Sequence, residues 1–279
     1  IFGKFGAPTW GIVGAAVGTL VSRVVMVILL WYLLAQDKSM NYYVLRFNWR
    51  IVDFAKLKKI IQLGFPSAMQ MFFEVALFTA AIWLSGVLGK NAQAANQIAL
   101  NLSSMTFMVG MGLGVAAMIR VGNQKGLKDY INLRRIAQSI FLLTLLLEVV
   151  FAGLFMLGRH LFPTIYLNVE DLKNAVDNAE VISIAAQLLL VAAFFQISDG
   201  LQVVVLGALR GLQDVVVPTV ITAIAYWAIG FPLCFYLGLR TDLGSTGIWI
   251  GLLAGLTASA GMLYLRFQYL TKKLITDNH

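Results

Sequence analysis

Two carboxylates, Glu74 and Asp199, lie within long apolar segments of this 279-residue sequence. A charged side chain near the centre of a bilayer costs roughly 2.5–3.5 kcal/mol on insertion scales. Such a residue therefore usually faces a polar cavity, where it binds an ion, a proton or a cationic ligand. The chemistry that these two residues indicate is reversible cation binding without a covalent step.

The two carboxylates are expected at similar depth in the membrane. Glu74 follows Pro66 by eight residues, which is about 12 Å of helix. Asp199 precedes Arg210 by eleven residues, which is about 16 Å from the same face. Both acids can therefore face one interior site.

Three polar stripes surround the acids at helical spacing. They comprise Gln70 and Glu74 in one segment, Gln93, Gln97, Asn101 and Ser104 in a second, and Gln196, Asp199 and Gln202 in a third. The aromatic Phe78 lies one turn after Glu74 on the same face. The stripes predict one polar cavity between neighbouring helices. Amide side chains also form hydrogen bonds between membrane helices, and that structural role stays open for them.

Other polar residues give weaker signals. Glu148 is flanked by apolar residues and has no polar stripe of its own, so a structural role is favoured over a functional one. Arg23 could pair with a carboxylate or extend to the membrane surface. His160 and His279 are too few and too far apart for a metal site, so no metal cofactor or organic cofactor is expected.

The composition places these residues in a membrane. The chain is 59% hydrophobic and 12% charged, against roughly 25% charged residues in soluble domains. Segments long enough to cross the bilayer, which needs about 20 apolar residues, occupy residues 10–34, 66–88, 94–119, 136–158, 181–208, 215–239 and 246–267. The predicted fold is all-α, a polytopic transmembrane helical bundle with seven spans.

The net charge of +8 reflects membrane topology. Alternate loops collect the basic residues, namely Lys38, Arg46, Arg50, Lys56, Lys58, Lys59, Arg120, Lys125, Lys128, Arg134, Arg135, Arg210, Arg266, Lys272 and Lys273. By the positive-inside rule these loops and the C-terminus are cytoplasmic. The lipid bilayer is therefore an expected partner, and nucleic acid is not.

The domain organisation follows from a connector and a repeat. Residues 35–63 form the longest cytoplasmic connector, and its second half has one apolar and one basic face, typical of a helix in the headgroup plane. Glycines spaced by three and then four residues open both the first and the last span, at Gly11 and at Gly244. We therefore expect residues 1–34 to be the last helix of a missing lobe, residues 64–270 a six-helix lobe, and residues 271–279 a cytoplasmic tail.

Several strings resemble multidrug and toxic compound extrusion (MATE) transporters. They are GFPSAMQMFFEVALF at 64–78, AANQIALNLSSMTFM at 94–108, IRVGN at 119–123 and FFQISDGLQVVVLGALRG at 194–211. The resemblance covers the sixth to the twelfth helix. It implies export of a small cationic or amphipathic substrate, driven by H⁺ or Na⁺. The exporter would be a twelve-helix protein of the bacterial inner membrane, which we expect to be a monomer.

The resemblance also implies roles for residues. Glu74 and Asp199 match the cation-coupling acids, and they would be the ligands of Na⁺ if Na⁺ is the coupling ion. Phe78 and Gln97 match positions near bound substrate. The predicted substrate-binding set is Gln70, Phe78, Gln97, Asn101, Phe195 and Gln196.

Phe195 is a departure that affects the choice of ion. Some relatives have a tyrosine four residues before the aspartate, so a hydroxyl ligand is missing here. Because Na⁺ favours several oxygen ligands, the sequence favours H⁺ while leaving Na⁺ open. Alternative functions are a flippase of lipid-linked saccharides, which a cationic cavity would favour, and an intramembrane enzyme, for which no HExxH or GxSxG motif appears.

Overall fold

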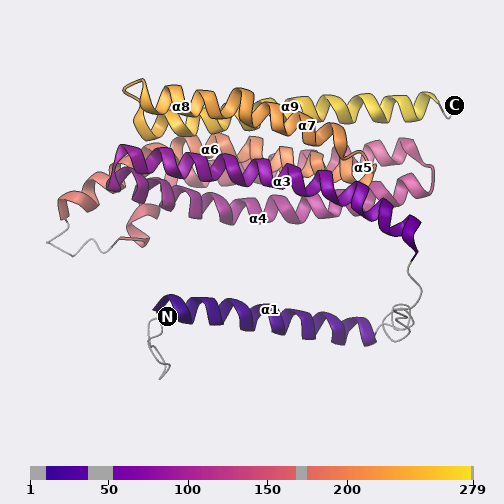
Figure 1. The fold of residues 1–279 in the computed structure, drawn as a ribbon. Coiled ribbons are helices and arrows are strands. Elements are labelled where there is room, and N and C mark those ends of the chain that lie inside the picture. Colours follow the sequence, from indigo (N-terminus) through magenta and orange to yellow (C-terminus); the bar gives the residue numbers. More distant parts are fainter. Residues whose placement is uncertain (1–10, 37–52, 168–174, 278–279) are drawn as a thin grey trace. The chain divides into compact units, whose positions relative to one another are not determined.

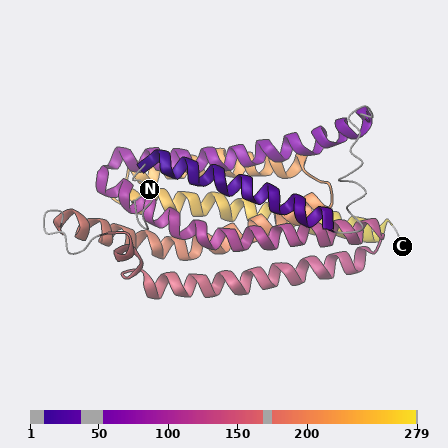
Figure 2. The same ribbon diagram turned by 90° about the horizontal axis from the view of Figure 1, so that it is seen from below.

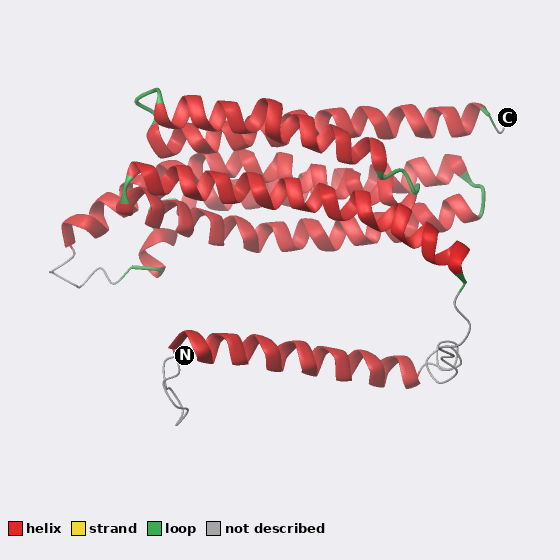
Figure 3. Cartoon of the chain, viewed as in Figure 1, coloured by secondary structure: helices red, strands yellow, loops and turns green. Residues whose placement is uncertain are grey.

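The computed structural model describes residues 11–36, 53–167 and 175–277. Within these ranges every regular element is a helix, and no strand occurs (Figure 3). The predicted all-α class is therefore confirmed. The chain divides into two compact units, residues 1–58 and residues 59–279, which are described separately.

The first unit contains α1 (Gly11–Gln36). Its large apolar side chains are exposed within this unit on every face, as on a helix that lies among lipids or other helices. Residues 16–36 are long and apolar enough to cross a membrane, in agreement with the first predicted span. Its membership of a further lobe stays a prediction, and residues 37–52 of the predicted connector lie outside the described residues.

The second unit is a bundle of long helices (Figure 1). Along the chain these are α3 (Phe54–Leu88), α4 (Lys90–Gly126), α5 (Tyr130–Gly158), the short η2 (Phe162–Ile165), α6 (Ala175–Gly211), α7 (Val216–Ile224), η3 (Ala225–Gly230), α8 (Phe231–Leu239) and α9 (Gly244–Thr276). The long helices lie side by side in both views (Figures 1 and 2). With α1, the described residues contain seven candidate spans at the predicted places.

The end of the predicted connector is continuous with the next span. Residues 54–63 form the first turns of α3, which runs through Pro66 without a break. That these turns lie in the headgroup plane stays a prediction. A proline removes one backbone hydrogen bond and can bend a helix without ending it. The hydroxyl of Thr219 on α7 lies 2.8 Å from the carbonyl oxygen of Pro66, which ties α3 to the bundle at this point.

Helix α6 packs against α4, α5 and α9. Its backbone approaches α4 closely because Gly207 faces Gly114. A Cβ atom added at Gly207 would lie 2.8 Å from the carbonyl carbon of Gly114, a distance that real Cβ atoms essentially never show. This close packing sets how near the polar residues of α4 and α6 can come.

The span of residues 216–239 contains a wide helical turn. α7 passes into the π-helical turn η3 and then into α8, whose Pro232 has no N–H to donate to the turn before it. The turn packs against α9, where a Cβ on Gly255 would lie 2.9 Å from Cα of Gly230. Tyr226, on this turn, is fully buried.

Polar contacts hold the helix ends. The Arg266 guanidinium forms a half-buried ion pair with Asp214 at 2.9 Å, joining α9 to the loop after α6. Asp129 caps α5 by accepting a hydrogen bond from the backbone N–H of Asn132 at 3.1 Å. The hydrogen bonds from Asn132 hold the pKa of Asp129 below its ordinary value, so this cap weakens only in acid.

Gly207→Ala should destabilise the bundle, because the added methyl group meets the backbone of α4. Overpacking of this kind costs about 1–3 kcal/mol. We expect a lower midpoint of thermal unfolding for the detergent-purified protein. Gly112→Ala is the matched control, since a Cβ there meets nothing within 4 Å; equal midpoints for the two variants would contradict the close contact of α4 and α6.

Candidate cation and substrate site

A cavity of about 340 Å³ opens between α3, α4 and α6. Its wall contains Met71, Glu74, Val75, Phe78, Ile82, Gln97, Leu100, Ser103, Ser104, Phe107, Phe195 and Asp199. Most of these side chains are apolar, with a few polar groups among them, as in pockets for small organic molecules. The two carboxylates are the ionisable groups of this wall.

Glu74 and Asp199 reach this cavity from α3 and α6, as their similar depth predicted. Glu74 is half-buried, whereas Asp199 is only 5% exposed. One carboxylate oxygen of Asp199 has no hydrogen-bond partner among the described residues. A carboxyl group in this position is stabilised when a cation or water supplies the missing partner, or when a proton neutralises it.

Aromatic rings form one side of the cavity. The ring of Phe195 packs edge-on against Phe78 at 6.0 Å and against Trp249 at 5.3 Å, measured between ring centroids. Trp249 is fully buried, and its indole N–H donates a hydrogen bond of 2.9 Å to the side-chain oxygen of Asn96 on α4. This bond fixes the ring that supports Phe195, so the aromatic wall is held rigidly beside the acids.

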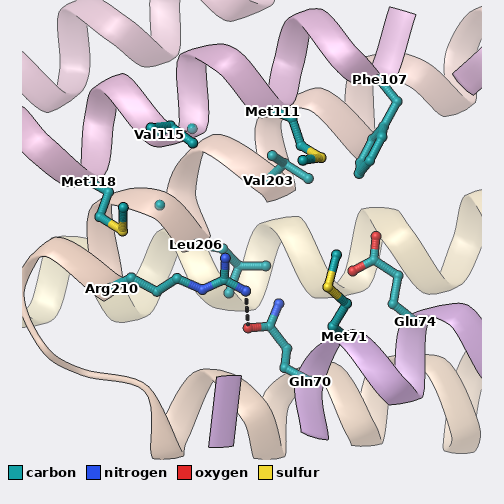
Figure 4. Close-up of a pocket in the computed structure, with 12 residues that line it drawn as sticks. Gln70, Met71, Glu74, Phe107, Met111, Val115, Met118, Val203, Leu206 and Arg210 are labelled. Atoms are coloured by element: carbon teal, nitrogen blue, oxygen red, sulfur yellow. Dashed lines mark hydrogen bonds between the residues drawn. The ribbon is translucent and has the colours of Figure 1, made fainter. Parts of the chain in front are cut away.

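A smaller cavity, about 110 Å³, also contacts Glu74 (Figure 4). Figure 4 shows Arg210 and Glu74 pointing toward it from α6 and α3. Arg210 donates a hydrogen bond of 3.1 Å to the side-chain oxygen of Gln70, which is 3% exposed. Glu74 therefore lines both cavities, with an acid nearby in one and a cation nearby in the other.

The charges around the two acids differ. Glu74 interacts electrostatically with Arg210, whereas Asp199 interacts with Glu74 and Glu148. Among the described residues, Glu74 thus has an attractive partner in Arg210 besides the like charge of Asp199, whereas the charges that act on Asp199 are those of other acids. A cation that enters the larger cavity would be attracted to both carboxylates and repelled by Arg210.

The structure distributes the predicted substrate-binding residues unevenly. Phe78, Gln97 and Phe195 line the larger cavity, and Gln70 lines the smaller one. Asn101 lines neither: its side chain is exposed, and its amide nitrogen donates to the backbone oxygen of Gln97 at 3.0 Å. One helical turn separates the two, but α4 faces the cavity with Gln97 and turns Asn101 away.

Gln196 also lies apart from both cavities. It is 2% exposed, and neither polar atom of its amide has a hydrogen-bond partner within the described ranges. Gln202, from the same predicted stripe, donates a hydrogen bond to the hydroxyl of Tyr226 on η3. Because α6 is surrounded by helices, its polar residues face several interfaces, and only Asp199 of the stripe reaches the cavity.

Sequence reasoning missed several groups of this region. Arg210 was read only as a marker of the cytoplasmic side, although an arginine eleven residues from a buried acid can extend along its helix. Tyr226 and Asn96 belong to none of the polar stripes that the helical spacing predicted. Asn96 precedes Gln97 directly and so lies on another face of α4, where it meets Trp249.

The candidate cation ligands of the larger cavity are its two carboxylates, Glu74 and Asp199. Within the described ranges, no three His, Cys, Asp or Glu side chains lie close enough together to hold a metal ion jointly. A Na⁺ ion at Glu74 and Asp199 would need further oxygen ligands. The assignment of these two acids to Na⁺ stays a prediction.

Long apolar helices around an internal cavity with two acids in its wall are typical of a polytopic membrane protein. The model of the MatE family matches residues 66–236, which include Glu74, Asp199 and both cavities. The chain belongs to this family.

Two curated bacterial relatives are both described as "Probable multidrug resistance protein NorM". The protein of Bradyrhizobium diazoefficiens is 34% identical over 276 residues, which cover 99% of this chain and 58% of that protein. The protein of Pasteurella multocida is 38% identical over 277 residues, covering 96% and 57%. The chain therefore spans somewhat more than half the length of these relatives.

Solved structures share the fold. The eukaryotic MATE transporter AtDTX14 is similar with a TM-score of 0.81 and 22% identity, over 98% of this chain and 59% of that one. A MOP superfamily transporter from Pyrococcus furiosus, for which a reverse polarity of the binding pocket is described, gives 0.82 and 18%, over 95% and 57%. At these identities the likeness supports the fold alone.

Trp249→Phe should loosen the aromatic wall, because it leaves the buried oxygen of Asn96 without its donor. An unsatisfied buried acceptor costs about 1–3 kcal/mol, so the thermal midpoint of the purified protein should fall. Adding Asn96→Leu should restore part of the loss, since both polar partners are then gone. The exposed Trp83 provides the control Trp83→Phe; a loss as large there would contradict the role of the Trp249–Asn96 bond.

Proposed function

We propose that this chain is the C-terminal part of a cation-coupled antiporter that exports small cationic or amphipathic compounds from a bacterial cell. The observation that carries the proposal is the cavity shared by Glu74 and Asp199, with its aromatic and apolar wall. The names of the curated relatives, which describe multidrug resistance proteins, support the same class of substrate.

The proposed mechanism is competition for the carboxylates. A cationic substrate and a coupling cation cannot both neutralise Glu74 and Asp199 fully, so binding of one weakens binding of the other. Exchange between the two sides then needs only a change in access to the cavity and no covalent step. Arg210 contributes as a fixed positive charge beside Glu74, which disfavours double occupancy.

We propose H⁺ as the coupling ion, with Na⁺ as the alternative. Phe195 places an aromatic ring without a hydroxyl against the cavity, and the acids are the ionisable groups of the wall. A proton needs one carboxylate oxygen, whereas Na⁺ needs several oxygens together.

The rest of the proposal concerns the whole protein. It comprises a plasma-membrane location, a cytoplasmic C-terminus, a monomer, and a twelve-helix assembly of two lobes in which α1 ends the first. A flippase of lipid-linked saccharides fits less well, because the larger cavity carries acids rather than the cations that would hold a phosphate group.

Glu74→Gln and Asp199→Asn in the full-length protein should each abolish gradient-driven efflux of tetraphenylphosphonium from vesicles. The amides keep the shape of the side chains but remove the charge on which competition depends. Efflux rates are compared at matched protein levels in the membrane. Glu180→Gln is the control, because this exposed acid lies outside the cavity; efflux that survives in both cavity variants would defeat the mechanism.

The coupling ion is tested by imposing the two gradients separately on the same vesicles. A pH gradient alone should drive efflux by the full-length protein, and a Na⁺ gradient alone should not. If Na⁺ alone drives efflux, the alternative ion is correct, and Phe195→Tyr should then strengthen the dependence on Na⁺ by adding a hydroxyl ligand.

A further inference from the structure

Glu148 on α5 is a buried acid that neither cavity explains. It is 2% exposed, and its Oε2 atom has no hydrogen-bond partner in the part of the chain that the structure describes. It does not line the cavities that hold Glu74 and Asp199. An unpaired carboxyl group in the core of a membrane bundle is costly, and such residues are commonly functional.

Two glycines make room for this carboxyl group. A Cβ added at Gly200 on α6 would lie 2.7 Å from Cγ and Cδ of Glu148, and one at Gly110 on α4 would lie 3.4 Å from Oε1. Glu148 therefore occupies space that any other residue at position 200 would fill. Gly200 directly follows Asp199, so the Glu148 carboxyl group packs against α6 beside the acid of the larger cavity.

The helices packed against α5 bring no cation to Glu148. They are α4, α6 and α9. On α6 the ionisable neighbour is Asp199, which interacts electrostatically with Glu148. On α4 no ionisable residue occurs from 103 to 117, on either side of Gly110.

On α9 the nearest ionisable groups lie toward the N-terminal end of α5, away from Glu148. Tyr264 packs against Phe141, about two turns before Glu148, and Arg266 is paired with Asp214. Arg134 on α5 itself is hydrogen bonded to Gln268. Around Glu148, the described part of the chain thus offers like charge and no compensating positive charge.

We propose that Glu148 is a second proton-carrying group of the coupling site, placed behind Asp199 and titrating together with it. The inference rests on the proposed antiport function. Two neighbouring carboxyl groups without a cation do not ionise independently, and the protons they release belong to the pair. When Glu148 is ionised, its charge holds the proton on Asp199, and the proton that Asp199 finally releases passes to water in the larger cavity.

This arrangement sets the pH at which the cavity accepts a cation. Asp199 binds a cationic substrate only after it has lost its proton. Because the negative charge of Glu148 opposes that loss, the site stays protonated to higher pH than Asp199 alone would. Glu148 thus carries a proton of the pair and acts on the substrate only through Asp199, without touching the substrate.

The test is the pH dependence of tetraphenylphosphonium binding to the full-length purified protein. In Glu148→Gln the pH of half-maximal binding should fall by about one unit, since a like charge next to Asp199 has been removed. Glu148→Asp, which keeps the acid, should restore the midpoint of the unchanged protein. Thr144→Val is the matched control, one turn earlier on the same buried face of α5, and should not move it.

The proposal fails if Glu148→Gln leaves the midpoint unchanged, if Glu148→Asp shifts it equally, or if Thr144→Val shifts it as well.

A second measurement needs neither transport nor substrate. In the Glu74→Gln/Asp199→Asn double variant, infrared spectra should still show a protonated carboxyl band that disappears between about pH 5 and about pH 9. That band should be absent after Glu148→Gln is added. If the double variant lacks the band, the proposal is overturned. If the band is present but the unchanged protein binds no tetraphenylphosphonium, the result counts against the antiport function alone.

Discussion

The free-energy cost of an ionised carboxylate away from water governs this structure. Glu74, Asp199 and Glu148 are held inside one bundle of apolar helices, and Arg210 is the cation that acts on the first of them. Among the described residues, Asp199 and Glu148 have no such partner, so a proton or an external cation would have to neutralise them. Under the proposed function, that dependence makes the occupancy of the cavity respond to the ions around it.

The helix packing makes the arrangement possible. Gly114 and Gly207 let α4 and α6 approach closely, and Gly110 and Gly200 leave space for a carboxyl group between the helices. The aromatic wall is fixed from behind by the bond between Trp249 and Asn96. Rigid surroundings of this kind keep the acids near one another, so the charge on one affects the proton on the next.

Much of the architecture could be predicted from the sequence, because apolar length and helical period report membrane spans directly. The meeting of Glu74 and Asp199 followed from counting residues along two helices. The direction in which individual side chains point could not be predicted from the sequence in the same way. Asn101 and Gln196 share a helix and a period with cavity residues but point elsewhere, and Glu148 gained its neighbours only when α5 packed against Gly200. Such contacts depend on which helices are adjacent, and periodicity within one helix carries no information about that.

The central claim is that a cationic substrate and protons compete for the same carboxylates. It is tested most directly by calorimetry of tetraphenylphosphonium binding to the full-length protein in buffers of different ionisation enthalpy, which gives the protons released for each cation bound. Competition predicts proton release that grows as the pH is lowered within the binding range, because more carboxyl groups are then protonated before the cation arrives. Binding that releases no protons at any pH would contradict the account.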